Sequence, residues 1–347
     1  MPPLILVISS LAEPCTDYVI DEISALGGGV IRINYEEAVT DSKWAVELSN
    51  TIKNPNVSIS NSLVNLLNAD EPDAIWMRRW GYPALPKSFD EQSKAFAFNE
   101  ISSLISGLPS VLNKKWINHP YRERISSNKI LQLEMARKCG WHIPNTIITN
   151  DALAVSRFKN AIGRVIFKPV SAVQSPFRRH NPIAQKKMNL RWPDMDFGIE
   201  ADDSLIFTQE LTEEKIEFLD SLKWSPAIFQ ERIDKVADIR VTVIGTTIFA
   251  CRIDSQSRDE TATDFRYMNI IGALPHELIE LNGRMKEQIL EFMKNLGLTF
   301  GCLDFLENKN GEYIFLEINP SGQWLWIEQL TGAPISKALA IELMNLS

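Results

Sequence analysis

The sequence predicts an α/β protein made of three α+β subdomains, and three features of the chain lead to this expectation. Its length of 347 residues exceeds what a single hydrophobic core usually organises. The chain opens with a strand–helix–strand pattern, in which apolar runs at residues 4–8 and 30–33 flank a helix at 17–26 that glycines 27–29 end. Beyond Pro226 the pattern changes to consecutive short strands.

The composition excludes several classes of protein. The net charge of -8 argues against a general nucleic-acid binder, which needs a basic surface. No apolar stretch approaches the roughly 20 residues of a membrane span, and the run at 4–8 lacks the preceding basic segment of a signal peptide. We therefore expect a cytoplasmic protein with neither nucleic acid nor membrane as partner. Buried free thiols, without metal-site spacing, are expected at Cys15, Cys139, Cys251 and Cys302.

The N-terminal domain is expected at residues 1–115 and the central subdomain at 116–226. A strand at 73–77, ending in Arg78-Arg79, and a helix at 89–106 complete the first domain after the opening pattern. Residues 116–120 form a connector, and Ser126-Ser127-Asn128 can cap a helix that runs to residue 138. The other elements expected in the central subdomain are strands at 146–149, 165–168 and 205–208, a long mobile loop at 171–203 and a helix at 212–222.

The C-terminal subdomain is expected at residues 227–347. Its elements are strands at 228–233, 240–244 and 247–254, a helix at 285–296, a hairpin around Asn310-Gly311 and a closing helix at 335–346. Asn-Gly is the favoured centre of a two-residue hairpin turn, and this register places Asp304 directly opposite Glu317. Asn319 shares the face of Glu317. Oxygen ligands of this kind suit Mg2+, although two solvated acids on an exposed sheet remain an alternative.

Basic residues and a second acidic position complete the candidate site. Lys129 follows a helix start, and Lys168 ends an apolar strand beside a loop, so both are placed to reach a phosphate, although single lysines are common. Asp238 and Arg240 share one face of a strand, where a guanidinium can pair with a carboxylate or phosphate. A half-exposed edge strand is the alternative there. The segment Asp264-Phe-Arg266 repeats the acid-x-Arg spacing.

The order of these elements resembles the ATP-grasp superfamily, and within it the microviridin-type graspetide synthetases, which macrocyclise ribosomal peptides. The resemblance covers nearly the whole chain. It rests on Trp76-Met-Arg-Arg79, Trp116-Ile-Asn-His-Pro120, Asn128-Lys129, Lys168-Pro169, Asp238-Ile-Arg240-Val-Thr-Val-Ile-Gly245, Asp264-Phe-Arg266 and Phe315-Leu-Glu-Ile-Asn-Pro-Ser-Gly-Gln-Trp324. The implied fold is an ATP-grasp fold preceded by a βαβ pre-ATP-grasp domain.

The resemblance implies a role for each matching position. Lys129 and Lys168 would hold the ATP phosphates, and Asp238 would bind the ribose. The segment that would cradle adenine is Gln230, Glu231, Arg232 and Ile233. The residues that would hold two Mg2+ ions are Asp304, Glu317 and Asn319. Arg240 and Arg266 would steady the acceptor carboxylate and the developing acyl phosphate.

One departure from the family pattern concerns the loop after Lys168. Many ATP-grasp enzymes place a glycine-rich loop there, whereas here no glycine occurs until Gly198. Basic side chains are gathered instead at Arg178, Arg179, His180, Lys186, Lys187 and Arg191. We interpret this cluster as a lid over the triphosphate or an acidic peptide, with a solvated loop as the alternative.

The resemblance implies an ADP-forming carboxylate-amine/hydroxyl ligase. Its partner would be a precursor peptide with a leader and an acidic core, whose Asp or Glu side chains are joined to hydroxyls or amines. The leader would contact the helix at 212–222, and a homodimer is one oligomeric state to consider. The alternatives are a ligase that joins a free amino acid to a carboxylate, as in ribosomal-protein glutamylation or glutathione synthesis, and a non-catalytic peptide-binding scaffold.

Overall fold

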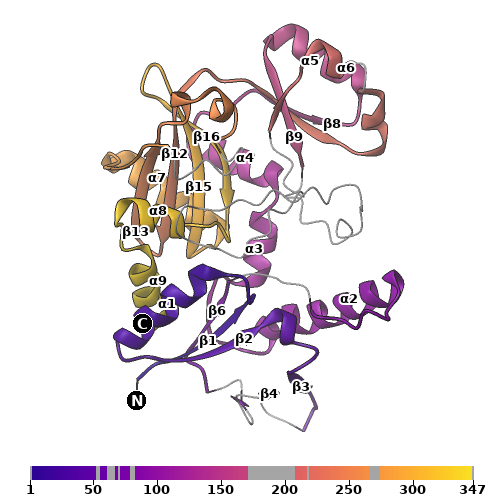
Figure 1. The fold of residues 1–347 in the computed structure, drawn as a ribbon, viewed down its shortest axis with the longest axis vertical. Coiled ribbons are helices and arrows are strands. Elements are labelled where there is room, and N and C mark those ends of the chain that lie inside the picture. Colours follow the sequence, from indigo (N-terminus) through magenta and orange to yellow (C-terminus); the bar gives the residue numbers. More distant parts are fainter. Residues whose placement is uncertain are drawn as a thin grey trace.

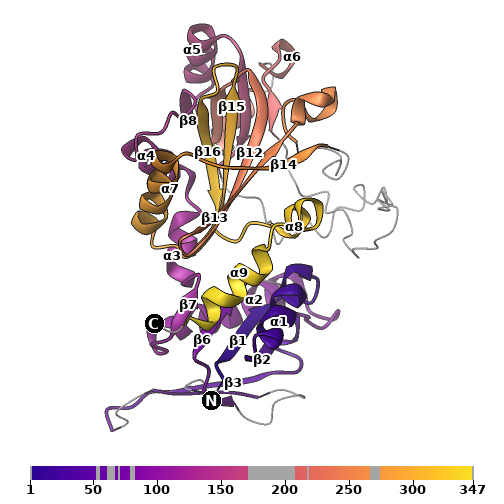
Figure 2. The same ribbon diagram turned by 90° about the vertical axis from the view of Figure 1, so that its left-hand side faces the viewer.

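The computed structural model describes residues 2–51, 55–60, 67–68, 71–78, 83–170, 208–216, 219–265 and 274–345. The expected loop at 171–203 with its basic cluster, residues 205–207 of an expected strand, Arg79 and Arg266 lie outside these described residues. Figures 1 and 2 show the N-terminal domain at one end, the orange and yellow C-terminal sheet in the middle and the magenta central subdomain at the other end.

The N-terminal domain contains a parallel sheet in the order β2-β1-β6-β7. Its strands are β1 (Leu4–Ser9), β2 (Gly29–Asn34), β6 (Ala74–Met77) and β7 (Lys115–Ile117), and its helices are α1 (Pro14–Ala25) and α2 (Glu91–Gly107). The apolar runs of β1 and β6 are buried because the sheet is covered on both faces. Residues 116–120 were expected to be only a connector. This is wrong in part, because the first residues of that segment belong to β7 and continue the sheet.

A small antiparallel sheet, β3 (Lys43–Glu47), β4 (Asn56–Ser60) and β5 (Leu67–Asn68), was not predicted from the sequence. In β4, Val57 and Ile59 are buried and alternate with polar residues. The segment has many Asn and Ser residues, which favour turns. Pairing with β3 and β5 and the packing of these two side chains into the core beside Tyr35 stabilise it as a strand.

The central subdomain is an antiparallel sheet in the order β10-β9-β11-β8. Its elements are β8 (Thr146–Thr149), β9 (Val165–Pro169), β10 (Gln209–Glu210), β11 (Ala227–Glu231) and α5 (Ala152–Ile162). α3 (Pro120–Ser126) and α4 (Lys129–Lys138) precede them, and α4 packs into the core of the C-terminal sheet. The predicted cap is confirmed, because the Asn128 side chain accepts from the N–H groups of Ile130 and Leu131. The helix expected at 212–222 is wrong in part: α6 covers Glu213–Ile216, whereas Leu219–Trp224 is a 3-10 helix.

The C-terminal subdomain is a five-stranded antiparallel sheet in the order β14-β13-β12-β15-β16. Its elements are β12 (Lys235–Ile244), β13 (Thr247–Ile253), β14 (His276–Ile279), α7 (Gly283–Leu296), β15 (Phe300–Asn308), β16 (Tyr313–Asn319), α8 (Leu325–Thr331) and α9 (Ile335–Met344). The edge-strand alternative for Asp238 and Arg240 is wrong, because β12 is the central strand. Ile239, Val241 and Val243 face the core, as the alternation predicted.

The β15–β16 hairpin pairs Asp304 with Glu317, as predicted, although the turn differs from the predicted one. The loop contains an extra residue: Asn308 N–H donates to the Glu312 carbonyl, and Gly311, at a φ of 75°, takes the left-handed position. A register shift beside Phe305, at which Leu316 is the extra residue, then restores the pairing of the acids. Two errors in the predicted register therefore cancel at the functional position.

α9 packs the C-terminal end of the chain against the N-terminal domain. Leu339 and Leu343 of α9 share one hydrophobic cluster with Val7 of β1, Val19 of α1 and Trp324. Figure 2 shows α9 between the C-terminal sheet and the N-terminal domain. The C-terminal subdomain and the N-terminal domain thus share buried apolar surface, which stabilises their relative position.

The cysteines give a test of this packing. All four are buried and free, and burial raises the pKa of the Cys15 and Cys251 thiols to about 11. Because the thiolate is the reactive form, we expect native protein at about pH 8 to resist iodoacetamide and denatured protein to be alkylated at every cysteine. Mass spectrometry measures both, and rapid alkylation of Cys15 in native protein would contradict the described packing.

No described helix is long and apolar enough to cross a membrane.

Candidate functional site

A pocket lies between the central sheet and the C-terminal sheet. Residues of β9, β11, β12, β15 and β16, and of the segments beside them, line it. The residues predicted from the sequence that line it are Lys168, Gln230, Glu231, Arg232, Ile233, Asp238, Asp304 and Glu317. Of the remaining candidates, Lys129 and Arg240 contact these lining residues directly, and Asn319 ends the same strand as Glu317.

Each of the two opposed acids has a cationic partner. The Arg240 guanidinium donates through Nη1 to both oxygens of Asp304, at 2.8 and 2.7 Å. Lys129 Nζ lies 2.8 Å from Glu317 Oε2. The two cations come from β12 and α4, so acids and bases of four separate segments meet at the β15–β16 pair.

Arg240 is held in a buried setting. Burial opposes its charge, but the adjacent Asp304 carboxylate more than compensates and raises the pKa of the guanidinium above its ordinary value. A second amino group, Nη2, donates to the Gln323 carbonyl at 3.2 Å, and the buried Nε has no hydrogen-bond partner. The side chain is therefore a fixed positive charge that aligns Asp304.

Lys129 owes its position to the start of α4. The Asn128 cap begins the helix at Lys129 itself, and Lys129 Nζ also donates to Gln132 Oε1, at 3.3 Å. Gln132 is fully buried and holds β16 in place, because it accepts from Ile318 N–H and donates to the Ile318 carbonyl. Sequence reasoning missed Gln132; its position one helical turn after Lys129 was the available signal.

Asp238 lines the pocket on β12, beside Lys235. Lys235 Nζ lies 2.6 Å from Asp238 Oδ2, and both side chains are buried. Burial raises the pKa of the Asp238 carboxyl, and the ammonium of Lys235 opposes this shift. The sequence-based reading did not single out Lys235, which stands on the same strand and supplies the charge that lets Asp238 be buried.

Gln230 lines the pocket, and its side chain is fully buried. Its Nε2 donates to Thr146 Oγ1 at 3.0 Å, and the Thr146 hydroxyl donates to the Pro144 carbonyl at 2.7 Å. This chain of donors fixes the amide orientation. The buried Gln230 Oε1 is left without a partner, so a ligand with an amino group, such as the exocyclic amine of adenine, fits this wall of the pocket.

The donor set at the other end of the pocket suits a hard cation that also binds phosphates. Within the described part of the chain, no cluster of three His, Cys, Asp or Glu side chains occurs. Asp304 and Glu317 are paired across the hairpin, and Asn319 is exposed two residues further on. Mg2+ commonly takes one or two carboxylates and completes its shell with water and phosphate oxygens, and this set matches that requirement.

The other candidate residues are held by surface contacts. Asn145 donates its side-chain amide to Glu231 Oε2 at 2.7 Å, and Arg232 Nη1 lies 3.4 Å from Glu210 Oε2. Asp264 lines the pocket and accepts from Thr208 N–H at 3.3 Å, so the acid-x-Arg segment begins at the site. Its arginine, Arg266, lies outside the described residues.

Comparison with known proteins finds one family model and solved structures of similar fold. A family model described as the MvdD pre-ATP grasp domain matches residues 4–124. No curated protein sequence matches significantly. Among solved structures, a RiPP-associated ATP-grasp ligase of Chryseobacterium gregarium in complex with ADP and a leader and core peptide is 26% identical, with a TM-score of 0.81 over 99% of this chain and 97% of that one.

Two further solved structures have the same fold. The macrocyclase MdnC of Microcystis aeruginosa MRC, bound with the precursor peptide MdnA, is 26% identical, with a TM-score of 0.80 over 99% of each chain. The ATP-grasp ligase PsnB complexed with minimal precursor, Mg and ADP is 23% identical, with a TM-score of 0.72 over 100% of this chain and 99% of that one. The predicted α/β, ATP-grasp fold is confirmed.

Proposed function

This chain is an ATP-grasp protein that resembles the ligases of ribosomally made peptides, and from this premise we propose that it is an ADP-forming peptide ligase. It activates Asp or Glu side chains of a precursor peptide as acyl phosphates. It then joins them to hydroxyl or amine side chains, which closes macrocyclic esters or amides. The observation that carries the proposal is the match over nearly the full length of both chains to a ligase bound to ADP, a leader and a core peptide.

The residues of the pocket account for the chemistry. When bound, ATP supplies the γ-phosphoryl group and Mg2+ neutralises charge on the phosphates. Gln230 would accept from the adenine amine through Oε1, and Asp238 would bind the ribose. Lys129 and Lys168 contribute positive charge at the phosphate end, where Asp304, Glu317 and Asn319 supply oxygen ligands. Arg240 keeps Asp304 aligned and adds a positive charge beside the developing acyl phosphate.

Finer features belong to the same proposal. The acid pair and Asn319 provide enough oxygens for two Mg2+ ions, and Arg266 steadies the acceptor carboxylate together with Arg240. The leader contacts the segment at 212–222, and the enzyme acts in the cytoplasm as a microviridin-like synthetase and a homodimer. The domain bounds proposed from the sequence are 1–115, 116–226 and 227–347.

The direct test is reconstitution with a small acidic, Thr-rich peptide encoded beside this protein. With ATP and Mg2+, we expect ADP release and the loss of one water per link in the mass of the peptide. Ligation of a free amino acid to the peptide would instead favour the alternative ligase. Absence of ATP turnover with every precursor would favour a binding scaffold.

Gln230 gives a prediction about nucleotide choice. Gln230→Met removes the acceptor that faces the adenine amine, so we expect a roughly tenfold loss of ATP affinity, the effect of one buried hydrogen bond. Calorimetry with ATP measures it. Gln329→Met, which removes an exposed amide that contacts Tyr18, is the control. Unchanged ATP affinity in Gln230→Met would remove this side chain from the nucleotide site.

A further inference from the structure

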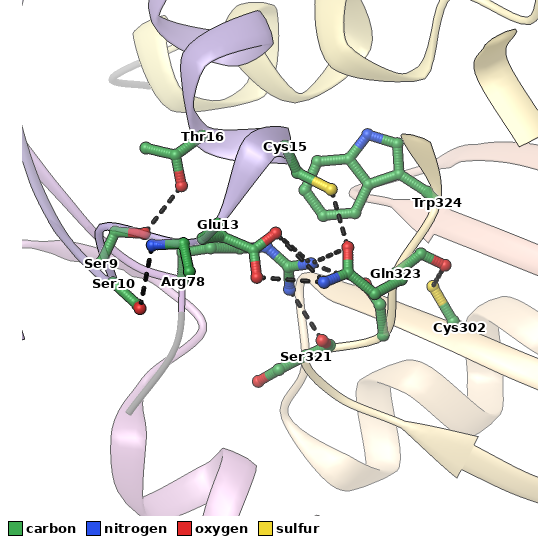
Figure 3. Close-up of polar contacts among 12 residues, drawn as sticks. Ser9, Ser10, Glu13, Cys15, Thr16, Arg78, Cys302, Ser321, Gln323 and Trp324 are labelled. Atoms are coloured by element: carbon green, nitrogen blue, oxygen red, sulfur yellow. Dashed lines mark hydrogen bonds and ion pairs between the residues drawn. The ribbon is translucent and has the colours of Figure 1, made fainter. Parts of the chain in front are cut away.

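A buried polar cluster joins the N-terminal domain to the loop that follows the candidate metal ligands. Figure 3 shows Glu13 and Arg78 of the N-terminal domain around Gln323, with Ser321 and Trp324 beside them. The Arg78 side chain is 1% exposed and that of Glu13 is 2% exposed. A charged pair this deeply buried requires compensation by hydrogen bonds, and none of these residues lines the described pocket.

Arg78 binds the backbone of the loop. It directly follows β6, and its N–H donates to the Ile8 carbonyl, so the parallel sheet fixes its backbone. Its guanidinium donates to the Ser321 carbonyl at 2.7 Å and to the Gly322 carbonyl at 3.2 Å. It also lies over the Trp324 ring, 4.4 Å from the centroid. With its bond to Gln323, this one side chain of the N-terminal domain contacts four successive positions beyond β16, residues 321–324.

Gln323 is held between the two charges. Its Nε2 donates to both Glu13 oxygens, at 3.2 and 3.0 Å, and its Oε1 accepts from Arg78 at 3.1 Å. Donor and acceptor are therefore each matched to a charge of the correct sign, which fixes the amide. The Gln323 carbonyl is the acceptor for Arg240 Nη2, and Arg240 in turn grips Asp304.

The opposite side of the loop is packed against β15. A Cβ atom on Gly322 would lie 2.5 Å from Cys302 Cβ and 2.9 Å from Arg240 Nη2. Only glycine allows this approach. Gly322 N–H also donates to the Asn319 carbonyl, and Ser321 N–H donates to Asn319 Oδ1 at 3.2 Å. Movement of the loop would therefore displace both Asn319 and the partner of Arg240.

We propose that Arg78, with Glu13 and Gln323, is a positioning residue through which the N-terminal domain sets the geometry of the metal and phosphate site. The inference rests on the proposed function, because it takes Asp304 and Asn319 to bind Mg2+. Arg78 touches no reacting group; it aligns the loop, and the loop aligns Asn319 and Arg240. A lysine at this position keeps the charge but cannot satisfy two carbonyls, an amide and a ring face with a planar fork.

The test is the affinity for ADP with Mn2+ as a spectroscopic substitute for Mg2+. Calorimetry gives the dissociation constant, and the electron paramagnetic resonance signal of Mn2+ gives the bound fraction. We expect Arg78→Lys to weaken Mn2+·ADP binding about tenfold, the size of a lost charged hydrogen bond. The control is Lys115→Met: Lys115 links β7 to Glu342 of α9, an interdomain contact away from the loop.

The control separates positioning from stability. Both variants are expected to lower the melting temperature, whereas only Arg78→Lys should change Mn2+·ADP affinity. Gln323→Met keeps the carbonyl that Arg240 uses but frees the loop from Glu13 and Arg78, and it should weaken Mn2+·ADP binding in the same way. It serves in place of Arg78→Lys if that variant does not fold. Because the two residues act as one unit, the double variant Arg78→Lys/Gln323→Met should bind Mn2+·ADP no more weakly than Arg78→Lys alone.

The outcomes distinguish this inference from the proposed function. Equal Mn2+·ADP affinity in the wild type and the variants, or equal loss in Arg78→Lys and Lys115→Met, would overturn the inference alone. A wild-type protein that binds no Mn2+·ADP would overturn both the inference and the proposed nucleotide site.

Discussion

Replacing Glu317 with glutamine is expected to abolish peptide ligation while leaving the fold intact. The substitution keeps the shape of the side chain but removes the charge that faces Asp304 and pairs with Lys129 at 2.8 Å. The amide keeps an oxygen but carries no negative charge to offset the cation and the phosphates it gathers, so turnover should fall at least about a hundredfold. Peptide mass and ADP release measure activity, and the melting temperature measures stability.

The same hairpin provides the matched control for Glu317. Glu312→Gln changes an exposed acid of the loop, whose contact is the Asn308 side chain at 2.8 Å. It should leave both activity and stability unchanged. Asn319→Ala, which removes the third oxygen ligand, should reproduce the loss seen for Glu317→Gln. Near-normal rates in either site variant would refute the metal assignment.

Arg240→Lys is expected to retain ATP binding and lose most ligation. The lysine keeps a positive charge but cannot donate through one fork to both Asp304 oxygens and to the Gln323 carbonyl. The loss of such buried charged hydrogen bonds costs about 2–4 kcal/mol, or roughly 30- to 1000-fold in rate. ATP affinity, melting temperature and product formation on one preparation measure the three effects separately.

Arg252→Lys is the control for Arg240. Arg252 stands on the neighbouring strand β13 and pairs with Glu307 at 2.8 Å on the same sheet, away from the lining of the pocket. Its replacement should affect neither ligation nor ATP binding. If Arg240→Lys loses stability and activity in proportion, the Arg240–Asp304 pair has a structural role only, and normal product formation would exclude Arg240 from the site.

The sequence by itself determined the elements whose signals are local. The apolar runs of β1 and β6, the Asn128 cap of α4 and the alternation in β12 each follow from the neighbouring residues. The predicted pairing of Asp304 with Glu317 is present only because the extra residue in the loop and the bulge at Leu316 offset each other, and neither had a signal in the sequence. Weak patterns failed: β4 and the 3-10 helix at Leu219–Trp224 have no strong local signal.

Only the tertiary structure decided which charges meet. Lys129 and Glu317 are 188 positions apart in the sequence, and Arg240 and Asp304 are 64 positions apart. No periodicity encodes such pairs, because they depend on how separate elements pack. The contact of Arg78 with Gln323 joins residues that are 245 positions apart. The motif that contains Arg78 was visible in the sequence. Its partner depends on how the N-terminal domain packs against the C-terminal subdomain, and this packing is stabilised by a hydrophobic cluster to which both contribute.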